Sequence, residues 1–364
     1  MIIDVHAHYY PRRYLELIGR PGLPPAAAAA LGGQDISERL ALLDQADIDI
    51  QVLSVSQAQP YLPDPRAAAE AAGVANDEYI ALCDAHRGRF LTFAALPLPH
   101  VDQSLAEIGR VAAIDPVVGF TMGCSVVSRQ LDDPLFEPVF AELDRRSAVI
   151  FLHPVGQEDT PWLAGRNLAW LIGAPFEDTA AALRLVLSGV PARFPRLKFI
   201  VPHLGGTLPF LLARISRKSA DEVSGGLRTM YYDTVHGSAE ALVSASRVYG
   251  PGRLLFGTDY PYCDEPQFRH HLSYLSEAGL GTGELDQVTG GTAAALLRVA
   301  GLPASWRGHV SHPVQSGWPK PVTARARNTT AKAQVMAMHA ALGKMAPNRV
   351  SLLPNFAAAA GGMC

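Results

Sequence analysis

The sequence has few cysteines, no long apolar run and no excess of basic residues. Its 364 residues include four cysteines and no CxxC pair, a usage typical of free thiols in a reducing compartment. No stretch of about 20 apolar residues is present that could span a membrane, and the first residues do not resemble a signal peptide. A formal net charge of −3 argues against a nucleic-acid-binding protein. We therefore expect a cytoplasmic globular protein with no nucleic-acid or membrane partner.

Acidic residues are absent from the last part of the chain. Asp286 is the final acidic position, and residues 305–364 contain seven Lys or Arg and no Asp or Glu. The remaining length exceeds the usual domain size of about 150 residues, but α/β barrels often do so as one unit. We therefore expect one domain over residues 1–304 and a basic, loosely ordered C-terminal extension over residues 305–364.

Short apolar and β-branched runs alternate with helical patterns along residues 1–264. The expected helices include Asp35–Ala46, Pro65–His86 and Phe176–Ser188. The expected strands are Ile2–His8, Ile50–Gln57, Phe90–Leu98, Val118–Cys124, Ala148–Val155, Lys198–Gly206, Met230–His236 and Leu254–Tyr262. Eight strand–helix units are the number that closes a (β/α)8 TIM barrel. An open doubly wound sheet is the alternative, and the absence of GxGxxG after the first strand weakens it.

Two connections are longer than a tight strand-to-helix loop requires, Tyr9–Gln34 and Gly156–Pro175. Both follow the C-terminal end of an expected strand, which is where barrel enzymes build their sites. We expect these loops to cap a pocket. Their arginines, Arg12, Arg13 and Arg166, could bind a substrate carboxylate or simply solvate the surface.

Histidines and one aspartate fall at the ends of four expected strands. His6 and His8 end the first strand, and because alternate residues share a face, their side chains leave the same side with Cα atoms about 6.6 Å apart. His153, His203 and Asp259 end the fifth, sixth and eighth strands. Taken singly, each histidine could simply pack in the core and the aspartate could simply form a turn. Together, at one mouth of a barrel, they predict a metal site.

The donor types and the fourth strand indicate which metal site to expect. Imidazole and carboxylate ligands suit Zn²⁺, and also Mn²⁺ or Fe²⁺. The expected strand Val118–Cys124 contains no lysine that could become a carbamate bridging two ions. We therefore expect a mononuclear site at the C-terminal ends of the strands, with Zn²⁺ as the first choice and Mn²⁺ as the alternative.

Short motifs are spread over residues 1–300. They include Asp4-Val5-His6-Ala7-His8, Asn76-Asp77-Glu78-Tyr79, Trp170-Leu171-Ile172-Gly173-Ala174-Pro175, Phe194-Pro195-Arg196-Leu197-Lys198, His203-Leu204-Gly205-Gly206 and Gly257-Thr258-Asp259-Tyr260-Pro261. In these motifs the sequence resembles the amidohydrolase superfamily, in the branch that includes aminocarboxymuconate semialdehyde decarboxylase.

The resemblance implies a role for each of the five strand-end residues. His6, His8 and His153 would be metal ligands, Asp259 a ligand or a proton carrier at the metal, and His203 the acid/base residue beside them. It also implies a homodimer and a metal-dependent, nonoxidative decarboxylase of an aromatic, hydroxyaromatic or muconate-type carboxylic acid.

The sequence also departs from the semialdehyde decarboxylases, and this leaves the substrate open. Pro154-Val155-Gly156 stands where those enzymes usually have a Trp-Asp pair after the fifth-strand histidine. A hydroxyaromatic acid, such as a methylsalicylate, is therefore at least as good an expectation. The same site could instead serve a lactone or amide hydrolase or a hydratase, and a binding module that keeps the barrel without its chemistry is a third reading. Release of CO₂ from a hydroxybenzoate panel would distinguish them.

Overall fold

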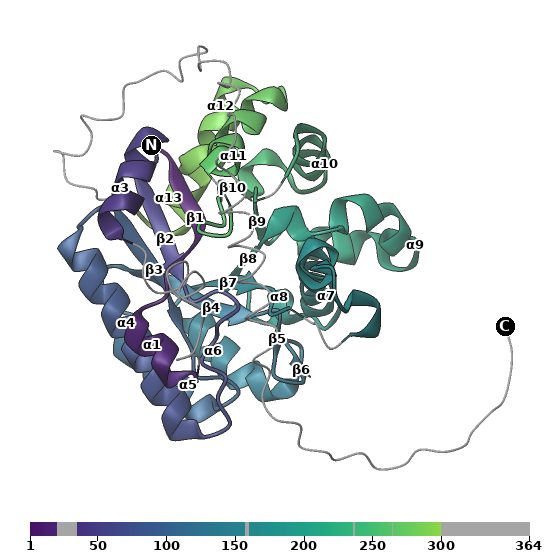
Figure 1. Cartoon of the computed structure of the whole chain (residues 1–364). Helices are drawn as coiled ribbons and strands as arrows, with labels where there is room; N and C mark the ends of the chain where they lie inside the picture. Colours follow the sequence, from purple (N-terminus) through teal and green to yellow (C-terminus); the bar gives the residue numbers. More distant parts are fainter. Residues whose placement is uncertain (20–34, 157–159, 236, 264, 300–364) are drawn as a thin grey trace, which may run out of the picture.

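Eight parallel strands form the centre of the molecule, and helices surround them (Figure 1). The computed structural model describes residues 1–19, 35–156, 160–235, 237–263 and 265–299. The extension expected over residues 305–364 lies outside the described residues. The strands are β1 (Ile3–His8), β2 (Ile50–Ser54), β3 (Phe90–Ala95), β4 (Val117–Gly123), β7 (Val149–His153), β8 (Lys198–Val201), β9 (Tyr231–Asp233) and β10 (Leu254–Leu255).

The strands pair in sequence order, and the last closes onto the first. Every ladder from β1 to β10 is parallel. At the seam, the Val5 N–H donates to the Phe256 carbonyl at 3.0 Å and the His8 N–H donates to the Tyr260 carbonyl at 2.8 Å. The expected (β/α)8 TIM barrel is confirmed. A small antiparallel pair, β5 (Ser125–Val126) and β6 (Arg129–Gln130), follows β4.

Several helices begin or end at residue types that favour a helix terminus. Asp35 and Asp64 cap two of the helices, α3 and α4, through side chains that accept backbone N–H groups. Gly189 follows α7 in the left-handed region at φ 75°, a conformation that favours glycine. The helices are α1 (Arg12–Leu17), α3 (Ile36–Gln45), α4 (Pro65–Ala85), α5 (Val101–Val111), α6 (Glu137–Arg145), α7 (Ala174–Leu187), α8 (Val190–Arg193), α9 (Leu208–Leu227), α10 (Ala239–Tyr249), α11 (Glu265–Glu277), α12 (Thr282–Asp286) and α13 (Thr292–Leu296).

Apolar side chains fill the lower half of the barrel interior, towards the N-terminal ends of the strands. They are supplied by β1, β2, β3, β7, β8 and β10, and α13 packs against them from below. The members are Ile3, Val5, Ile50, Val52, Phe93, Val149, Phe151, Ile200, Leu255, Ala293 and Leu297. A second, larger core joins the outer faces of the strands to the helices. The interior is therefore packed, and only its upper end is available for a site.

An irregularity in β1 turns its two histidines towards the barrel axis. Three steps along β1, from Asp4 to Ala7, match only two steps along β2. The extra residue is a β-bulge, which re-aims the side chains that follow it. Because of the bulge, Val5 packs in the lower interior while His6 and His8 face the same interior above it.

The Asp4 carboxylate holds the bulge in place. It accepts hydrogen bonds from the His6 N–H at 3.1 Å, from Gln51 Nε2 at 2.7 Å and from the Thr258 hydroxyl at 2.7 Å. The buried Arg39 donates in turn to Gln51 Oε1 at 2.5 Å and to the carbonyl of His8 at 2.6 Å. These bonds tie β1 to β2 on one side and to the segment after β10 on the other. The backbone under the two histidines is thereby fixed from both sides.

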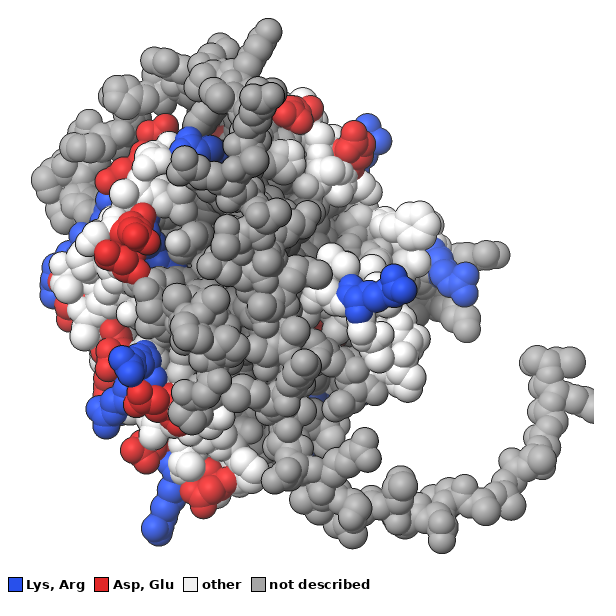
Figure 2. Space-filling model, viewed as in Figure 1, with Lys and Arg blue, Asp and Glu red and all other residues white. Residues whose placement is uncertain are grey.

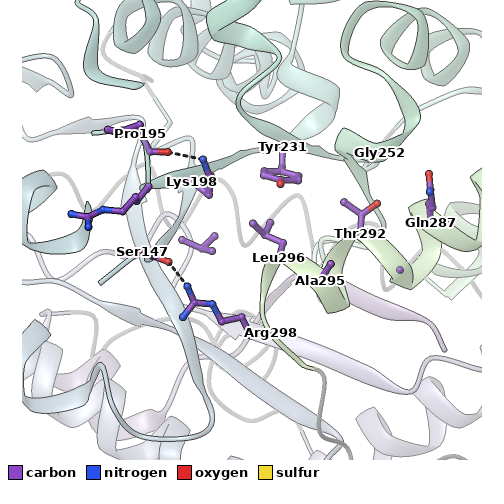
Figure 3. A pocket seen from close by; sticks show the side chains of 13 residues that line it. Ser147, Pro195, Lys198, Tyr231, Gly252, Gln287, Thr292, Ala295, Leu296 and Arg298 are labelled. Carbon is purple, nitrogen blue, oxygen red and sulfur yellow. Dashed lines mark hydrogen bonds between the residues drawn. The ribbon is translucent and has the colours of Figure 1, made fainter. Parts of the chain in front are cut away.

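The opposite end of the barrel carries a hollow of about 790 Å³. Its lining includes Val149, Lys198 and Tyr231, the first residues of β7, β8 and β9, together with Thr292 and Leu296 of α13 (Figure 3). The hollow lies at the N-terminal ends of the strands, away from the histidines. In a TIM barrel that end contributes to stability, whereas the C-terminal end holds the site.

The outer flank formed by α4 and α5 carries acidic and basic side chains side by side (Figure 2). Arg110 of α5, for example, donates to Asp77 of α4 at 2.6 Å and to Glu107 at 2.7 Å. Within the described ranges, no helix combines the length and the apolar character needed to cross a membrane.

Candidate metal centre

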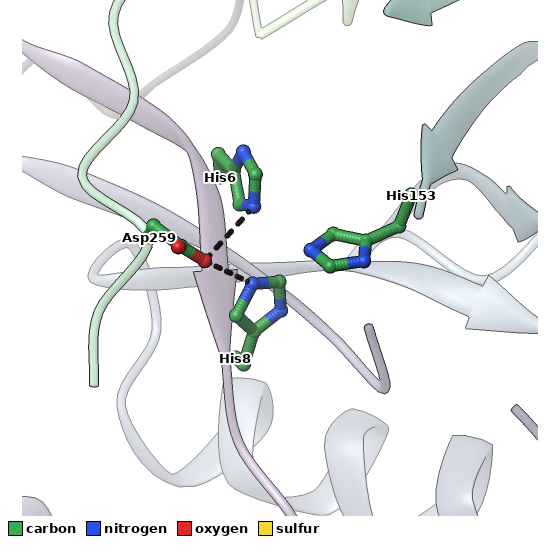
Figure 4. Close-up of side chains that lie close together, drawn as sticks. All are labelled: His6, His8, His153 and Asp259. Carbon is green, nitrogen blue, oxygen red and sulfur yellow. Dashed lines mark hydrogen bonds and ion pairs between the residues drawn. The ribbon is translucent and has the colours of Figure 1, made fainter. Parts of the chain in front are cut away.

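Four of the predicted side chains converge at the upper end of the barrel (Figure 4). His6 and His8 come from β1, His153 ends β7, and Asp259 lies in the segment after β10. Each offers one ligand atom, and these four atoms lie within 4.8 Å of one another. All four residues are buried, Asp259 being the most exposed at 8%. The predicted convergence of residues far apart in sequence is confirmed.

The aspartate joins two of the imidazoles. Asp259 Oδ1 lies 2.9 Å from His8 Nε2 and 3.2 Å from His6 Nε2. The ring centroids of His6 and His8 are 4.9 Å apart, and His153 lies 5.1 Å and 4.9 Å from them. Asp259 reaches this position with φ 60°, in the left-handed region, at the start of the turn that leads to Tyr260 and Pro261.

The other nitrogen of each ring is held by a partner outside the cluster. His6 Nδ1 lies 2.7 Å from Asp233 Oδ2, and His8 Nδ1 lies 3.1 Å from the Ser54 hydroxyl. His153 Nδ1 lies 2.7 Å from the carbonyl of Pro154. Such partners fix the orientation of a ligating imidazole and raise its basicity. The three Nε2 atoms are therefore turned towards one another, and the Ser56 hydroxyl lies 3.0 Å from that of His153.

The donor set fits a single divalent cation. Three imidazole nitrogens and one carboxylate are ligands that zinc accepts, with ligand atoms about 2.0–2.2 Å from the ion. His6 Nε2 is buried and forms an ion pair with Asp259 Oδ1 at 3.2 Å that lacks the geometry of a hydrogen bond. A buried nitrogen without a hydrogen bond is costly unless it binds something else. A cation among the four donor atoms would satisfy it.

The negative charges around the cluster also favour a bound cation. Burial lowers the pKa of His6, but the negative charges of Asp233 and Asp259 outweigh it and raise that pKa to about 10. Burial, with the positive charge of His6 adding to it, lowers the pKa of His8 to about 4. The two carboxylates thus stabilise one positive charge inside a ring of imidazoles, and a metal ion could take the place of that proton.

His203 stands beside the cluster rather than in it. Its ring centroid lies 5.4 Å from that of His6 and 6.3 Å from that of His153. The residue has φ 53°, and its N–H donates to Asp233 Oδ1 at 2.9 Å. His203 thus lies beside the cluster, where the sequence placed it, and its role as the acid/base residue stays a prediction.

The glycines after His203 allow this arrangement. Gly205 and Gly206 have φ 73° and 63°, and a Cβ on Gly206 would lie 1.9 Å from the carbonyl of Pro175. The chain therefore turns tightly under the histidine and packs directly on the start of α7. A larger residue at position 206 has no space.

Two aspartates of the site were missed by sequence reasoning. Asp233 ends β9 and contacts both His6 and the backbone of His203, while Asp178 of α7 contacts the His203 ring. An acidic residue inside an apolar strand was a usable signal for Asp233. Asp178 follows Glu177 on an amphipathic helix, where an acidic residue normally faces solvent, and no pattern in the sequence distinguishes it.

The arginines of the long loops do not reach the cluster. Arg12 is exposed and lies 3.4 Å from Glu16, and Arg13 and Arg166 are exposed as well. Trp170 packs instead against the backbone of Gly156, just beyond His153. Residues 20–34 and 157–159 of these loops lie outside the described residues.

A closed parallel barrel with histidines and an aspartate gathered at its C-terminal mouth defines the class of barrel metalloenzymes. Within that class, the chain belongs to the amidohydrolase family, whose model matches residues 3–299.

Comparison with known proteins points to decarboxylases in this family. The chain is 29% identical over 323 residues to the 6-methylsalicylic acid decarboxylase of Penicillium expansum, covering 82% of this chain and 97% of that protein. It is 30% identical over 245 residues to the 2-amino-3-carboxymuconate-6-semialdehyde decarboxylase of Dictyostelium discoideum, covering 63% of this chain and 67% of that protein. A dihydroxybenzoic acid decarboxylase from Polaromonas, solved with bound manganese, has a TM-score of 0.71 at 22% identity, covering 82% and 98% of the two chains.

Proposed function

We propose that this protein is a metal-dependent, nonoxidative decarboxylase of a hydroxyaromatic carboxylic acid. The observation that carries the proposal is the buried group of His6, His8, His153 and Asp259 with His203 beside it. Membership of a family in which the relatives are named decarboxylases supports the same reaction.

The four clustered residues would hold one divalent ion, and His203 would act next to it. When bound, the ion supplies positive charge that holds the substrate carboxylate and a neighbouring hydroxyl in place. His6, His8 and His153 provide the neutral Nε2 atoms, and Asp259 provides the carboxylate. Zn²⁺ and Mn²⁺ both accept this donor set.

The reaction requires one proton from the protein. The bond between the ring carbon and the carboxylate breaks, CO₂ leaves, and the electron pair stays on the ring carbon, which then takes the proton. Asp259 lies at the cluster and is positioned to deliver it, with His203 setting the protonation state of Asp259. General acid catalysis of this kind contributes about 10²–10⁴-fold.

Burial of the site assists both steps. The ligand residues are between 0% and 8% exposed, so the local dielectric is low and charge–charge interactions are strong. Bulk water is kept away from the ring carbon while it carries negative charge.

The protein also presents apolar side chains that suit a homodimer, which we propose as its assembly. Trp162, Leu171, Phe176 and Phe210 are between 44% and 87% exposed. The rings of Trp162 and Phe176 are 6.1 Å apart. Exposed apolar patches of this kind often mark protein interfaces. Analytical ultracentrifugation would test this, and a monomer at micromolar concentration would contradict it.

Two further proposals concern the whole chain. The family match ends at residue 299, which supports a division into a domain of residues 1–304 and a separate extension. Cys83 and Cys124 are thiols that form no disulfide, which supports a reducing, cytoplasmic location.

The test of the function is CO₂ release. Purified protein is loaded with Zn²⁺ or Mn²⁺ and incubated with a panel of hydroxybenzoates that includes 6-methylsalicylate, and the headspace gas and the products are measured. We expect CO₂ and the decarboxylated phenol in equal amounts, and no gas after chelation. Hydrolysis or hydration of lactones, amides or unsaturated acids without gas would overturn the proposal.

A His203→Ala variant completes this experiment. We expect it to retain metal and lose turnover, since His203 lies outside the ligand group. Loss of metal from this variant would contradict the division of roles.

A further inference from the structure

The ring of His203 is held from behind by a carboxylate that no role above has used. His203 Nδ1 lies 2.8 Å from Asp178 Oδ2. Asp178 belongs to α7, which packs against the turn that contains His203. The contact therefore joins two elements that are 25 residues apart in sequence.

Asp178 is fully buried and its second oxygen is also engaged. The carboxylate is 0% exposed, and its Oδ1 accepts a hydrogen bond from the Cys124 thiol at 3.4 Å. A buried carboxylate is costly unless its oxygens have partners, and here the His203 ring is the partner at short distance. Both neighbours restrict where the carboxylate can lie.

The two buried aspartates near His203 do different work. Asp233 holds the His203 backbone N–H and the ring of His6, whereas Asp178 holds the His203 ring. One carboxylate thus serves the metal ligand and the other the acid/base histidine. Neither can replace the other, because each is fixed by its own contacts.

We propose that Asp178 is the positioning residue for His203, an inference that rests on the proposed function. It keeps the proton on Nδ1, sets the ring orientation, and directs Nε2 to the reaction. When Nε2 holds a proton, the ring is a cation paired with Asp178. When Nε2 gives the proton up, the other proton stays on Nδ1 and keeps its hydrogen bond to Asp178. The carboxylate itself takes no proton. This is the general arrangement in which a buried carboxylate orients a catalytic histidine.

The electrostatics of the pair agree with this geometry. Burial lowers the pKa of His203, but the charge of Asp178 and the hydrogen bond to it outweigh that effect, so the pKa is raised. Burial raises the pKa of Asp178, and the His203 charge opposes it. Each residue therefore stabilises the charged form of the other.

The test uses Asp178→Asn in the full, metal-loaded chain. An asparagine amide donates to Nδ1 and so favours the opposite tautomer of His203. We expect kcat to fall by about 10²–10⁴-fold, KM to stay within about threefold, and metal content to be unchanged. Steady-state kinetics with metal analysis measure these values. A kcat within threefold of the parent would overturn the proposal.

The matched control is Cys124→Ala, which removes the other partner of Asp178 and leaves its contact with His203. We expect kcat to change by less than about threefold. If this variant loses as much activity as Asp178→Asn, Asp178 acts through packing and the proposal fails. Should Asp178→Asn not fold, Asp178→Ser removes the charge with a smaller side chain and carries the same expectations.

A double-mutant cycle and a spectroscopic readout separate positioning from simple structure. In a His203→Ala background, Asp178→Asn should have no further effect on kcat, because the residue it positions is gone. Nitrogen-15 NMR of the histidine rings, with His203 assigned from His203→Ala, should show the proton moving from Nδ1 to Nε2 in Asp178→Asn.

The NMR experiment does not depend on turnover. If the parent protein shows no decarboxylation, the proposed function fails while the His203 tautomer still reports on Asp178. An unchanged tautomer in Asp178→Asn would overturn the positioning role.

Discussion

The two halves of the barrel interior are built from the same strands but differ completely in chemistry. The lower half holds a cluster of apolar side chains, among them Val5 and Phe151. The upper half, one to three residues further along β1 and β7, holds His6, His8 and His153. Phe151 touches both halves, since its ring stacks on Phe93 at 5.2 Å and meets the His6 ring edge-on at 4.9 Å. An apolar, close-packed lower half therefore supports the buried titratable group above it.

The largest effect on the reaction rate is expected from a substitution of Asp259, in the upper half. Asp259→Asn removes the carboxylate charge and keeps a residue type that tolerates φ 60°. Decarboxylation should fall by about 10²–10⁴-fold. The free energy of unfolding, measured with urea in the presence of a chelator, should fall by about 1–3 kcal/mol, because the buried His6 charge loses one of its two carboxylate partners.

Asp64→Asn is the matched control for that change, because Asp64 caps α4 on the outside of the barrel and asparagine is also a good cap. It should leave the rate unaltered. A loss of more than about 3 kcal/mol in Asp259→Asn, as large as that from an emptied core position, would show that the upper half also carries the fold.

The lower half should respond in the opposite way. Phe151→Ala removes a fully buried ring and leaves a cavity, which costs about 3–5 kcal/mol of unfolding free energy. Urea denaturation measures it. A cost under about 1 kcal/mol would mean that the apolar lower half does not rigidly support the site above it.

The buried carboxylate of Glu177, near the mouth of the barrel, should make the free energy of unfolding depend on pH. Glu177 accepts the N–H groups of Val155 and Gly156, just beyond His153. Burial raises the pKa of Glu177 to about 7. The folded protein therefore binds this proton more tightly than the unfolded chain does. The stability it contributes is present below the unfolded pKa near 4.5 and is lost as the pH rises through about 7.

Glu177→Gln lacks this titration and so serves as its own reference. From pH 5 to pH 8, the unfolding free energy of the parent should fall relative to Glu177→Gln by on the order of 2–3 kcal/mol. Urea denaturation of both proteins at each pH gives the difference. A difference that stays constant with pH would rule out the raised pKa.

The smallest effect is expected at Asp233, which supports the proposed metal ligand His6. Asp233→Asn removes the charge behind His6 Nδ1 without touching the ligand atoms. Affinity for Zn²⁺ or Mn²⁺ should weaken by about 10–100-fold, as measured by competition with a chelator. Unchanged affinity would indicate that His6 needs no orienting carboxylate.

Much of the fold and of the candidate metal site could be predicted from the sequence. Alternation of strand and helix patterns indicated the barrel, and a barrel brings strand ends together whatever their separation in sequence. The histidines at the ends of β1 and β7 therefore followed from position alone. Strand lengths were less accurate. The strand expected over Leu254–Tyr262 ends at Leu255 in the structure, because the chain leaves the ladder to present Asp259 with a left-handed backbone.

The finer arrangement of the site could not be predicted. The bulge between Asp4 and Ala7 reverses which residues of β1 face inwards, and simple alternation does not report it. His203 lies two residues beyond the end of β8, also with a left-handed backbone, after Pro202. These features depend on local backbone geometry that side-chain hydrophobicity does not encode.

The sequence by itself determined the barrel and the kinds of atoms that gather at its mouth, because periodicity reports which face a residue occupies and topology brings the strand ends together. Only the tertiary structure decided which carboxylate serves which histidine. Asp178, Asp233 and Asp259 are chemically identical in the sequence, yet they contact the ring of His203, the ring of His6 and the ligand atoms of the cluster, respectively. Hydrogen bonds depend on separations of a few ångströms and on direction, and these are set by the packing of α7, β9 and the segment after β10 around the strands.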